Sequence, residues 1–438
     1  MSAAAGATMP GFELARHFAD DPAVRVAEVR LCNPFPRVDP VWTNASSPLE
    51  STTFHCPFAP AAPLLRPRFD GVNLYPLSHR MQVGILPEAS VGLDGVVLRD
   101  NRAFVFGPET ALEDGLRRTS FALTADDATY YEWNGAYDPA RVGNLRAIYE
   151  AQGRLSPGPP RAQARHSHHR KLASLLVRRG YVYYYHLTHV LPLFCLMRQR
   201  LLRDREIQLL TSGVFDEHFT MQGIAADRLV RCQPDTIYTA DELVSATPVP
   251  FLAPPRELLR LVRATYAPPS RGRPCVVFIR RTRAQRTAFR NQVCGELGIA
   301  ARADVCVLEN HHEILGAVRR YFAGQEVVDF DSDCMTPAEQ IELFARASVI
   351  IGAHGSGLTN MIFCPKQTSV VELMPERSFF PLFWHLAAAL ELPYAVHIVP
   401  GVSKYENFAV PPEAVLSALR MLTASPRSPA VEGVDGED

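Results

Sequence analysis

The sequence lacks any pair of cysteines in the Cys-x-x-Cys pattern, although its 438 residues include nine cysteines. Zinc ribbons and dithiol redox centres use that pattern, so neither class is supported. Cys275 and Cys306 lie inside apolar runs, PCVVFIR and ADVCVLE, where we expect buried free thiols. The odd count leaves room for one or two disulfides in the N-terminal half.

Long apolar runs and an excess of charge of one sign are also missing. No apolar stretch approaches the roughly 20 residues that cross a bilayer, so we expect no membrane span. The first residues, MSAAAGATMPGFELARHFADD, do not join a basic start to an apolar core as a signal peptide does. The single sequon at Asn44 matters only in a secretory chain, so the compartment stays open. A net charge of -1 gives no sign of a nucleic-acid or anionic-membrane partner.

The length and the 47% hydrophobic content predict two globular domains. Arg154–Lys171 is rich in proline, arginine and histidine, and we expect a solvated basic loop there rather than a metal site. Ser245–Glu257 carries four prolines and is the predicted linker. We therefore divide the chain into an irregular extension (1–75), an α/β domain (76–250), a Rossmann-like domain (251–423) and a disordered tail (424–438).

The C-terminal half alternates strands with helices. Apolar runs predict strands at residues 274–280, 303–309, 325–330, 348–352, 369–375 and 394–400. Helical spacing predicts helices at 284–298, 311–324, 336–347, from 358, and at 380–392. The start of the helix at 336–347 carries a capping pattern: Thr336 suits the N-cap, Pro337 the first helical position, and Glu339 the third position of a capping box. Strands that are apolar on both faces and alternate with helices predict a parallel sheet covered on each side.

The N-terminal half is less regular. Residues 96–107 predict a hairpin that turns at Asp100 and Asn101. Residues 181–202 predict an amphipathic helix with a break near Pro192, and 205–213 and 227–233 predict short strands. This pattern is compatible with a second α/β domain.

The segment ASVIIGAHGSGLTNMIFCP turns from a buried strand into a loop at His354, Gly355, Ser356 and Gly357. In a parallel sheet, ligands collect where strands end, and the following helix offers free N–H groups to an anion. The spacing matches neither a P-loop nor a dinucleotide fingerprint. A tight connection without a ligand is an equally good interpretation of the loop taken alone.

Two further features follow strands of the same predicted sheet. Glu372 interrupts the apolar strand at 369–375, and a carboxylate there can hold ribose hydroxyls. Arg280 and Arg281 begin an arginine-rich segment after the first strand, and guanidinium groups suit phosphate. Each has a plain alternative, a solvated glutamate or a solvated basic face. Their coincidence favours one site for a nucleotide diphosphate.

These residues resemble the C-terminal half of glycosyltransferase family 61. The family's His-Gly-(Ala/Ser)-Gly-Leu-Thr-Asn loop is followed by a strand ending in Glu and Pro. The matching residues here are His354, Gly355, Ser356, Gly357, Leu358, Thr359, Asn360, Glu372 and Pro375. The upstream segment FIRRTRAQRTAFRNQ is similar to the family's arginine-rich segment, with Gln292 where a Glu is usual.

The resemblance implies a GT-B fold, in which two Rossmann-like domains face each other across a cleft. It implies inverting transfer of a sugar, typically xylose or N-acetylglucosamine, from a UDP-sugar to a hydroxyl of a glycan or glycoprotein. We expect no Asp-x-Asp motif near the donor site, hence no metal or other cofactor. Family members usually act in the Golgi or endoplasmic reticulum, whereas a true lack of a signal would favour the cytoplasm.

The family usually carries a His, three residues and an Asp in the N-terminal half. Here YYYHLTHVLPLF gives His186 and His189 and no Asp. An inverting transfer needs a general base, so His189 is the candidate, with His186 positioning it. The plain alternative is that both are helix histidines whose ring nitrogens have hydrogen-bond partners and that neither acts in catalysis.

Three functions stay open at this point. The first is an active glycosyltransferase, and the second is a GT-B-like protein that binds a nucleotide or glycan without catalysis. The third is a scaffold that binds no nucleotide. The missing Asp and Gln292 favour the second slightly, while the combined loop, arginines and glutamate argue against the third.

Overall fold

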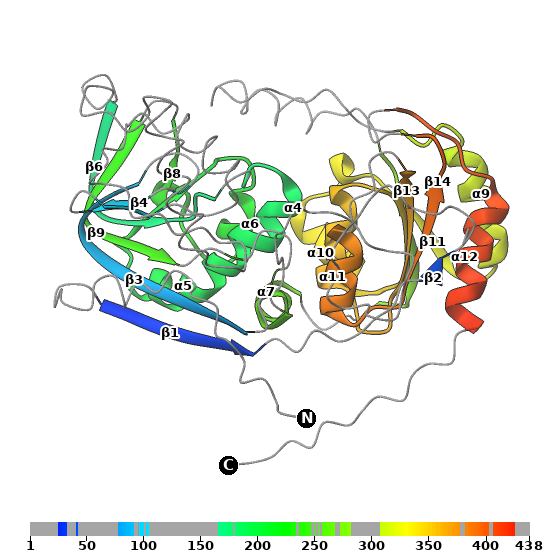
Figure 1. The fold of residues 1–438 in the computed structure, drawn as a ribbon, viewed down its shortest axis with the longest axis horizontal. Coiled ribbons are helices and arrows are strands. Elements are labelled where there is room, and N and C mark those ends of the chain that lie inside the picture. The colour runs from blue at the N-terminus through cyan, green and yellow to red at the C-terminus, as the bar shows by residue number, and fades with distance from the viewer. Residues whose placement is uncertain are drawn as a thin grey trace, which may run out of the picture.

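The structure is a computed structural model. It describes residues 25–32, 41–42, 78–91, 95, 97–99, 102–104, 165–177, 180–233, 236–246, 249, 254, 256–267, 272–281, 307–376, 382–402 and 406–424. Its strands form two sheets, one in each half of the molecule, with helices between them (Figure 1).

The C-terminal sheet is parallel throughout, as predicted. Its order is β11-β10-β12-β13-β14-β2. The strands are β2 (Val41–Trp42), β10 (Cys275–Ile279), β11 (Glu326–Phe330), β12 (Ala347–Ala353), β13 (Ser369–Pro375) and β14 (Tyr394–Val399). Every residue of β10 is buried, which is why its sequence reads as a continuous apolar run. The short β2 comes from the N-terminal extension, which the sequence did not predict.

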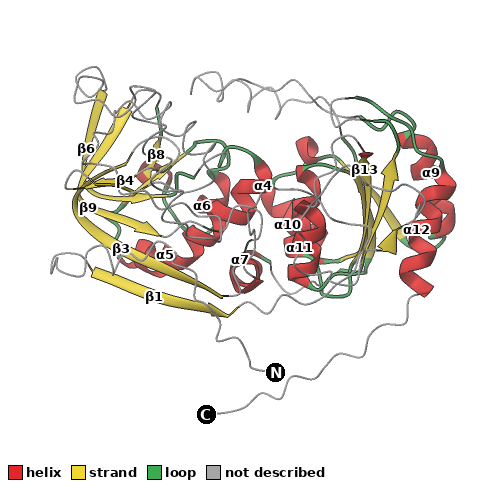
Figure 2. Cartoon of the chain, viewed as in Figure 1, coloured by secondary structure: helices red, strands yellow, loops and turns green. Residues whose placement is uncertain are grey.

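Helices cover both faces of this sheet (Figure 2). One face packs against α9 (His311–Tyr321) and α12 (Pro412–Ala424). The other packs against α10 (Pro337–Ala345), α11 (Leu382–Leu390) and the 3-10 helix η5 (Ser356–Phe363). The predicted capping box is confirmed, since the Thr336 hydroxyl accepts from the Glu339 N–H and the Glu339 carboxylate accepts from the Thr336 N–H.

The N-terminal sheet is mixed, with the order β5-β4-β3-β9-β6-β7-β8 and β1 paired with β3. Its strands are β1 (Arg25–Cys32), β3 (Ser78–Val91), β4 (Val97–Arg99), β5 (Arg102–Phe104), β6 (Arg165–Ser174), β7 (Gln208–Thr211), β8 (Leu229–Arg231) and β9 (Thr236–Ala246). The predicted hairpin is confirmed by the antiparallel pairing of Arg99 with Arg102. The strands predicted at 205–213 and 227–233 are confirmed as β7 and β8.

One prediction for this half is wrong. Residues 165–171 of the expected basic loop form most of β6, which pairs in parallel with β9 and β7. Within this segment the pairing partner is β9, and β7 joins only from Leu172 onward. Alternate side chains stay in water, so a polar sequence forms a strand.

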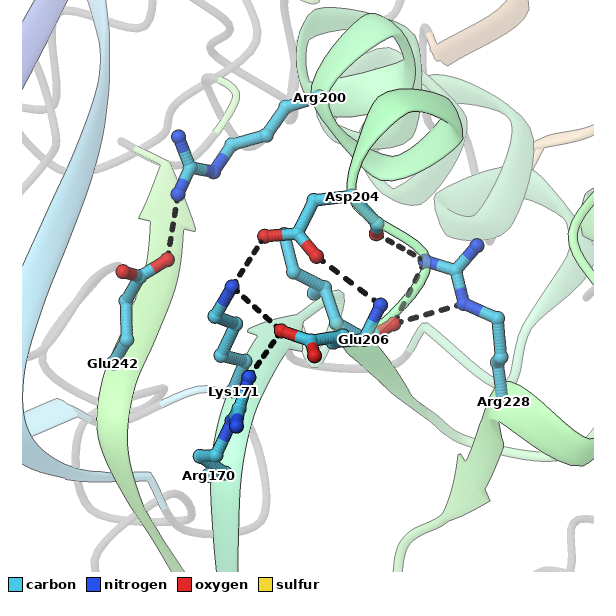
Figure 3. Close-up of polar contacts among 8 residues, drawn as sticks. Arg170, Lys171, Arg200, Asp204, Glu206, Arg228 and Glu242 are labelled. Atoms are coloured by element: carbon cyan, nitrogen blue, oxygen red, sulfur yellow. Dashed lines mark hydrogen bonds and ion pairs between the residues drawn. The ribbon is translucent and has the colours of Figure 1, made fainter.

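Salt bridges fasten this polar strand to its neighbours (Figure 3). The Lys171 ammonium donates to Asp204 at 2.7 Å and lies 3.0 Å from Glu206, in the loop that follows α5 (Leu191–Arg203). The Arg228 guanidinium donates to the Ile207 carbonyl at 2.7 Å. The cluster therefore joins β6 to the turn that enters β7.

The predicted helix at 181–202 runs through α4 (Tyr183–Tyr185), a π-helical turn η2 (His186–Val190) and α5. The Leu191 N–H bonds to the His186 carbonyl, five residues back. Pro192 has no N–H to continue the α-helical ladder, which accounts for the break predicted there.

One of the hydrophobic clusters spans both halves. Helix α7 (Arg256–Tyr266) follows the predicted boundary at residue 250, yet it packs against α5, η5 and α11. In the described part of the chain, Cys195, Cys232, Cys275 and Cys364 are buried free thiols, and Cys334 is an exposed one. No described helix has both the length and the apolar composition needed to cross a membrane.

Candidate functional site

The glycine loop lies at the carboxyl edge of the C-terminal sheet, as predicted. Strand β12 ends at Ala353, and the His354 N–H bonds to the Leu373 carbonyl of β13 at 2.9 Å. Gly355 has an extended backbone, and η5 begins at Ser356. Arg280 and Arg281 follow β10, the neighbouring strand in the sheet. The structure therefore brings the loop and the two arginines to one edge.

The two loop glycines make room for protein atoms. A Cβ on Gly355 would lie 2.8 Å from the Arg281 Cζ, and one on Gly357 would lie 2.9 Å from the Ile279 Cγ2. Both distances are closer than real Cβ contacts. The glycines are thus explained by close packing of the loop against the end of β10, whatever ligand the loop holds.

The two arginines differ in their partners. Arg281 donates from Nη1 to the His354 carbonyl and so anchors the loop. Arg280 donates through Nε and Nη2 to Asp329, and this hydrogen bonding raises the pKa of the guanidinium above its usual value. Arg280 remains about one third exposed. A phosphate that binds Arg280 must therefore share its guanidinium with Asp329.

Asp329 corrects the expectation that no Asp-x-Asp motif lies near the arginines. Asp329-Phe330-Asp331 and Asp331-Ser332-Asp333 overlap at the end of β11, beside β10. Asp329 bonds to Arg280 and to the His311 ring at 2.8 Å, and Asp331 accepts from the Asp333 N–H. Within the residues that the structure describes, no three potential ligands gather to hold a metal ion.

His354 is held by two buried side chains. Its Nδ1 lies 2.6 Å from Oε1 of Glu372 on β13, and the other carboxylate oxygen accepts from the Tyr394 hydroxyl on β14. The Phe383 ring packs edge-on against the imidazole, with the two ring centroids 5.2 Å apart. The His354 side chain keeps 11% of its surface exposed, whereas Glu372 is fully buried.

Glu372 therefore faces protein atoms with both oxygens. Burial raises the pKa of its carboxyl group, and the hydrogen bond with His354 opposes that rise. A ribose contact, which the sequence predicted for Glu372, finds no exposed oxygen in this arrangement. The role that the geometry supports is positioning of His354.

Leu358, Thr359 and Asn360 are all fully buried, although the motif predicted them at the donor site. Asn360 donates to the Gly357 carbonyl at 3.2 Å and accepts from the Tyr183 hydroxyl at 2.8 Å. These residues therefore shape the loop from beneath. Ser356, by contrast, is only half-buried and lies on the loop surface with His354, Gly355 and Gly357.

The contact between Tyr183 and Asn360 joins two segments that are 177 residues apart. Tyr183 opens the helix that carries His186 and His189, and η5 packs against both α4 and η2. The helical segment that carries the two histidines predicted for catalysis therefore packs against η5, the helix that follows the glycine loop.

Neither histidine reaches the surface. His186 is 2% exposed and lies among the rings of Phe215, His218 and Phe219. Burial, with His218 adding to it, lowers the pKa of His186 well below its usual value. His189 is 5% exposed, and its Nδ1 bonds to Thr188 at 2.7 Å. The burial of both rings agrees with the plain alternative better than with an accessible base. The satisfied hydrogen bonding of that alternative is not found at His186, whose Nε2 has no hydrogen-bond partner among the described residues.

Two residues of the site were missed. Tyr394 reaches Glu372 from the next strand, and Tyr183 reaches Asn360 from the other half. The only signal for Tyr183 was its place in the tyrosine cluster before His186. No motif marks Tyr394, because its role depends on strand pairing that the sequence does not show.

Comparison with known proteins finds similarity over the part of the chain that includes the glycine loop and the two arginines. Residues 183–371 match the family model described as glycosyltransferase 61. The match begins at Tyr183 and ends at the residue before Glu372. The beta-1,2-xylosyltransferase RCN11 of Oryza sativa subsp. japonica is 31% identical over 98 residues, which are 22% of this chain and 18% of that protein. The chain thus aligns with less than a fifth of that relative's length.

Proposed function

The chain belongs to glycosyltransferase family 61, and we propose that it transfers a sugar from a UDP-sugar to a hydroxyl group of a glycan or glycoprotein, with inversion at the anomeric carbon. Xylose and N-acetylglucosamine are the proposed sugars, and the beta-1,2-xylosyltransferase relative supports the first. The proposal includes a GT-B arrangement, with the donor on the C-terminal sheet and the acceptor towards the N-terminal one.

The observation that carries this proposal is the meeting of the glycine loop and the two arginines at one carboxyl edge. In open α/β sheets, ligands bind at this edge. Arg280 and Arg281 supply positive charge there, and the guanidinium fork matches phosphate oxygens. We assign the diphosphate to these arginines and to the loop surface formed by Gly355, Ser356 and Gly357.

The arginines also suit the chemistry of the leaving group. As the bond to the anomeric carbon breaks, negative charge grows on the diphosphate, and fixed cations stabilise that charge more in the transition state than in the ground state. We propose that this stabilisation needs no metal ion. Asp329 tempers the charge of Arg280 in this arrangement.

A second candidate function is binding of a UDP-sugar without transfer. The burial of His186 and His189 favours it, because neither ring is accessible to an acceptor hydroxyl in this structure. If either histidine serves as the base, the aromatic side chains that bury it must first move aside.

A transfer assay separates these functions. The full chain is incubated with a panel of radiolabelled UDP-sugars in EDTA, and slow hydrolysis of each donor is measured by release of free sugar. We expect hydrolysis of one or two donors and its loss in Arg281→Ala. Binding of UDP without hydrolysis of any donor would support the binding protein instead, and no binding at all would leave only the scaffold.

A further inference from the structure

Three neighbouring strands of the C-terminal sheet each contribute one side chain to a hydrogen-bonded chain. Tyr394 begins β14, Glu372 lies in the middle of β13, and His354 directly follows β12. The Tyr394 hydroxyl donates to one oxygen of Glu372, and the other oxygen lies 2.6 Å from His354 Nδ1. Tyr394 and Glu372 are buried, so water does not compete for these bonds.

This chain fixes the proton of the neutral imidazole. A carboxylate only accepts hydrogen bonds, so an ionised Glu372 requires the proton to be on Nδ1 of His354. The Tyr394 hydroxyl occupies the second carboxylate oxygen and prevents the group from turning away. Nε2 is then left with a lone pair, and no described residue bonds to it.

That lone pair decides what His354 can bind. A diphosphate oxygen carries no proton to donate, so neutral His354 in this form offers it no hydrogen bond. A sugar hydroxyl does carry a proton, and Nε2 can accept it. The loop surface therefore divides into cationic and N–H groups for phosphate and one basic nitrogen for a hydroxyl.

We propose that His354 is the general base that receives the proton of the attacking hydroxyl, and that Glu372 and Tyr394 are its positioning residues. This inference rests on the proposed transferase function. It replaces the buried histidines of the helix with a side chain that reaches the site.

The step balances without any further reactant. The acceptor oxygen forms a bond to the anomeric carbon as its proton moves to Nε2 of His354. The bond from that carbon to the diphosphate oxygen breaks, and its electron pair leaves with UDP. The imidazolium formed has its positive charge next to the Glu372 carboxylate, which stabilises it.

The first test measures the tautomer directly and needs no activity. Full-length protein labelled with ¹⁵N-histidine is compared with His354→Ala, and the lost resonances assign the His354 nitrogens. At neutral pH we expect a protonated Nδ1 and an unprotonated Nε2. In Glu372→Gln, the amide N–H can donate to Nδ1, so the proton should move to Nε2. An Nε2 proton in the wild-type protein would overturn the inference.

Tyr394→Phe tests the positioning residue. It keeps the ring and removes the hydroxyl, so we expect a mixture of the two tautomers. Tyr266→Phe is the matched control, because the buried Tyr266 hydroxyl has no hydrogen-bond partner among the described residues. Unchanged His354 resonances in Tyr394→Phe would show that Tyr394 serves packing alone.

The second test uses the rate of transfer. A general base contributes about 10²- to 10⁴-fold, so His354→Ala should lower kcat by that range while UDP affinity stays within about threefold. In Tyr394→Phe we expect a smaller loss of kcat with unchanged KM for the donor. A kcat within twofold of wild type in His354→Ala would refute the base while leaving the transferase intact. If no donor is turned over, the proposed function fails, and the tautomer measurement still decides the geometry.

Discussion

The hydroxyl of Tyr183 donates to Oδ1 of Asn360 at 2.8 Å, which ties the helix of the N-terminal half to the loop at the carboxyl edge of the C-terminal sheet. Asn360 in turn donates to the Gly357 carbonyl, so the same buried amide bonds both to Tyr183 of the N-terminal half and to the backbone of the glycine loop. The helix that begins at Tyr183 and the glycine loop, the two segments that resemble the family, are therefore held together as one structural unit.

Tyr183→Phe should weaken that unit. The variant leaves the buried Asn360 oxygen without this donor, and loss of such a bond costs about 1–3 kcal/mol. We expect a fall of that size in the free energy of unfolding, measured by urea denaturation. Tyr321→Phe is the control, because Tyr321 is 38% exposed, and its effect should stay within about 0.5 kcal/mol. Equal effects of the two substitutions would show that the contact contributes nothing.

Gly355→Ala should displace Arg281. The new Cβ would meet the guanidinium at 2.8 Å, and the end of this flexible side chain can move aside at little cost. We expect a small change in stability together with weaker binding of UDP, measured by calorimetry. Gly316→Ala is the control in α9, where the added Cβ meets only Arg320 Nη1 at 3.5 Å and the helix should gain about 0.5–1 kcal/mol. Unchanged UDP affinity in Gly355→Ala would remove the loop surface from the binding site.

Asp329→Asn should reduce stability in a pH-dependent manner. Burial raises the pKa of Asp329, but hydrogen bonds from Arg280 and His311 outweigh it, so the pKa in the folded protein is lowered. The stabilisation is therefore present above the ordinary aspartate pKa of about 4 and is lost as the pH falls through the lowered folded-state pKa.

Urea denaturation across the pH range checks this prediction. We expect a deficit of about 2 kcal/mol for Asp329→Asn at pH 7 that shrinks below about pH 4. The exposed Asp227→Asn variant, which removes a charge without a buried pair, should show little deficit at any pH. A deficit for Asp329→Asn that is the same at pH 7 and pH 3 would contradict the assignment to its ionised form.

The sequence predicted the C-terminal sheet well because four of its strands, β10, β12, β13 and β14, are largely apolar on both faces. The run in β10 and the capping box before α10 are local signals, and local signals do not depend on distant parts of the chain. The helix predicted at 284–298 lies outside the described residues, and so do residues 303–306 of the strand predicted at 303–309. So do Gln292 and the arginine-rich segment beyond Arg281.

The polar strand β6 and the burial of Glu372 were not predictable in the same way. Arg165–Lys171 forms a strand because β9 pairs with it, which is a property of the fold and not of the segment. Glu372 was correctly singled out as unusual in an apolar strand, but its partners come from β12 and β14. Only the register of those strands shows that it faces His354 and Tyr394.

Binding of UDP by the folded chain tests the central claim most directly. Thermal unfolding is measured in EDTA with UDP, GDP, CMP and ADP, for the wild-type protein and for Arg281→Ala. A ligand of the folded state at a hundredfold excess over its dissociation constant adds about 2.7 kcal/mol of stability. We predict that UDP alone raises the unfolding temperature, and that Arg281→Ala loses most of the shift. No shift with any nucleotide, or an equal shift in both proteins, would contradict a diphosphate site at this edge of the sheet.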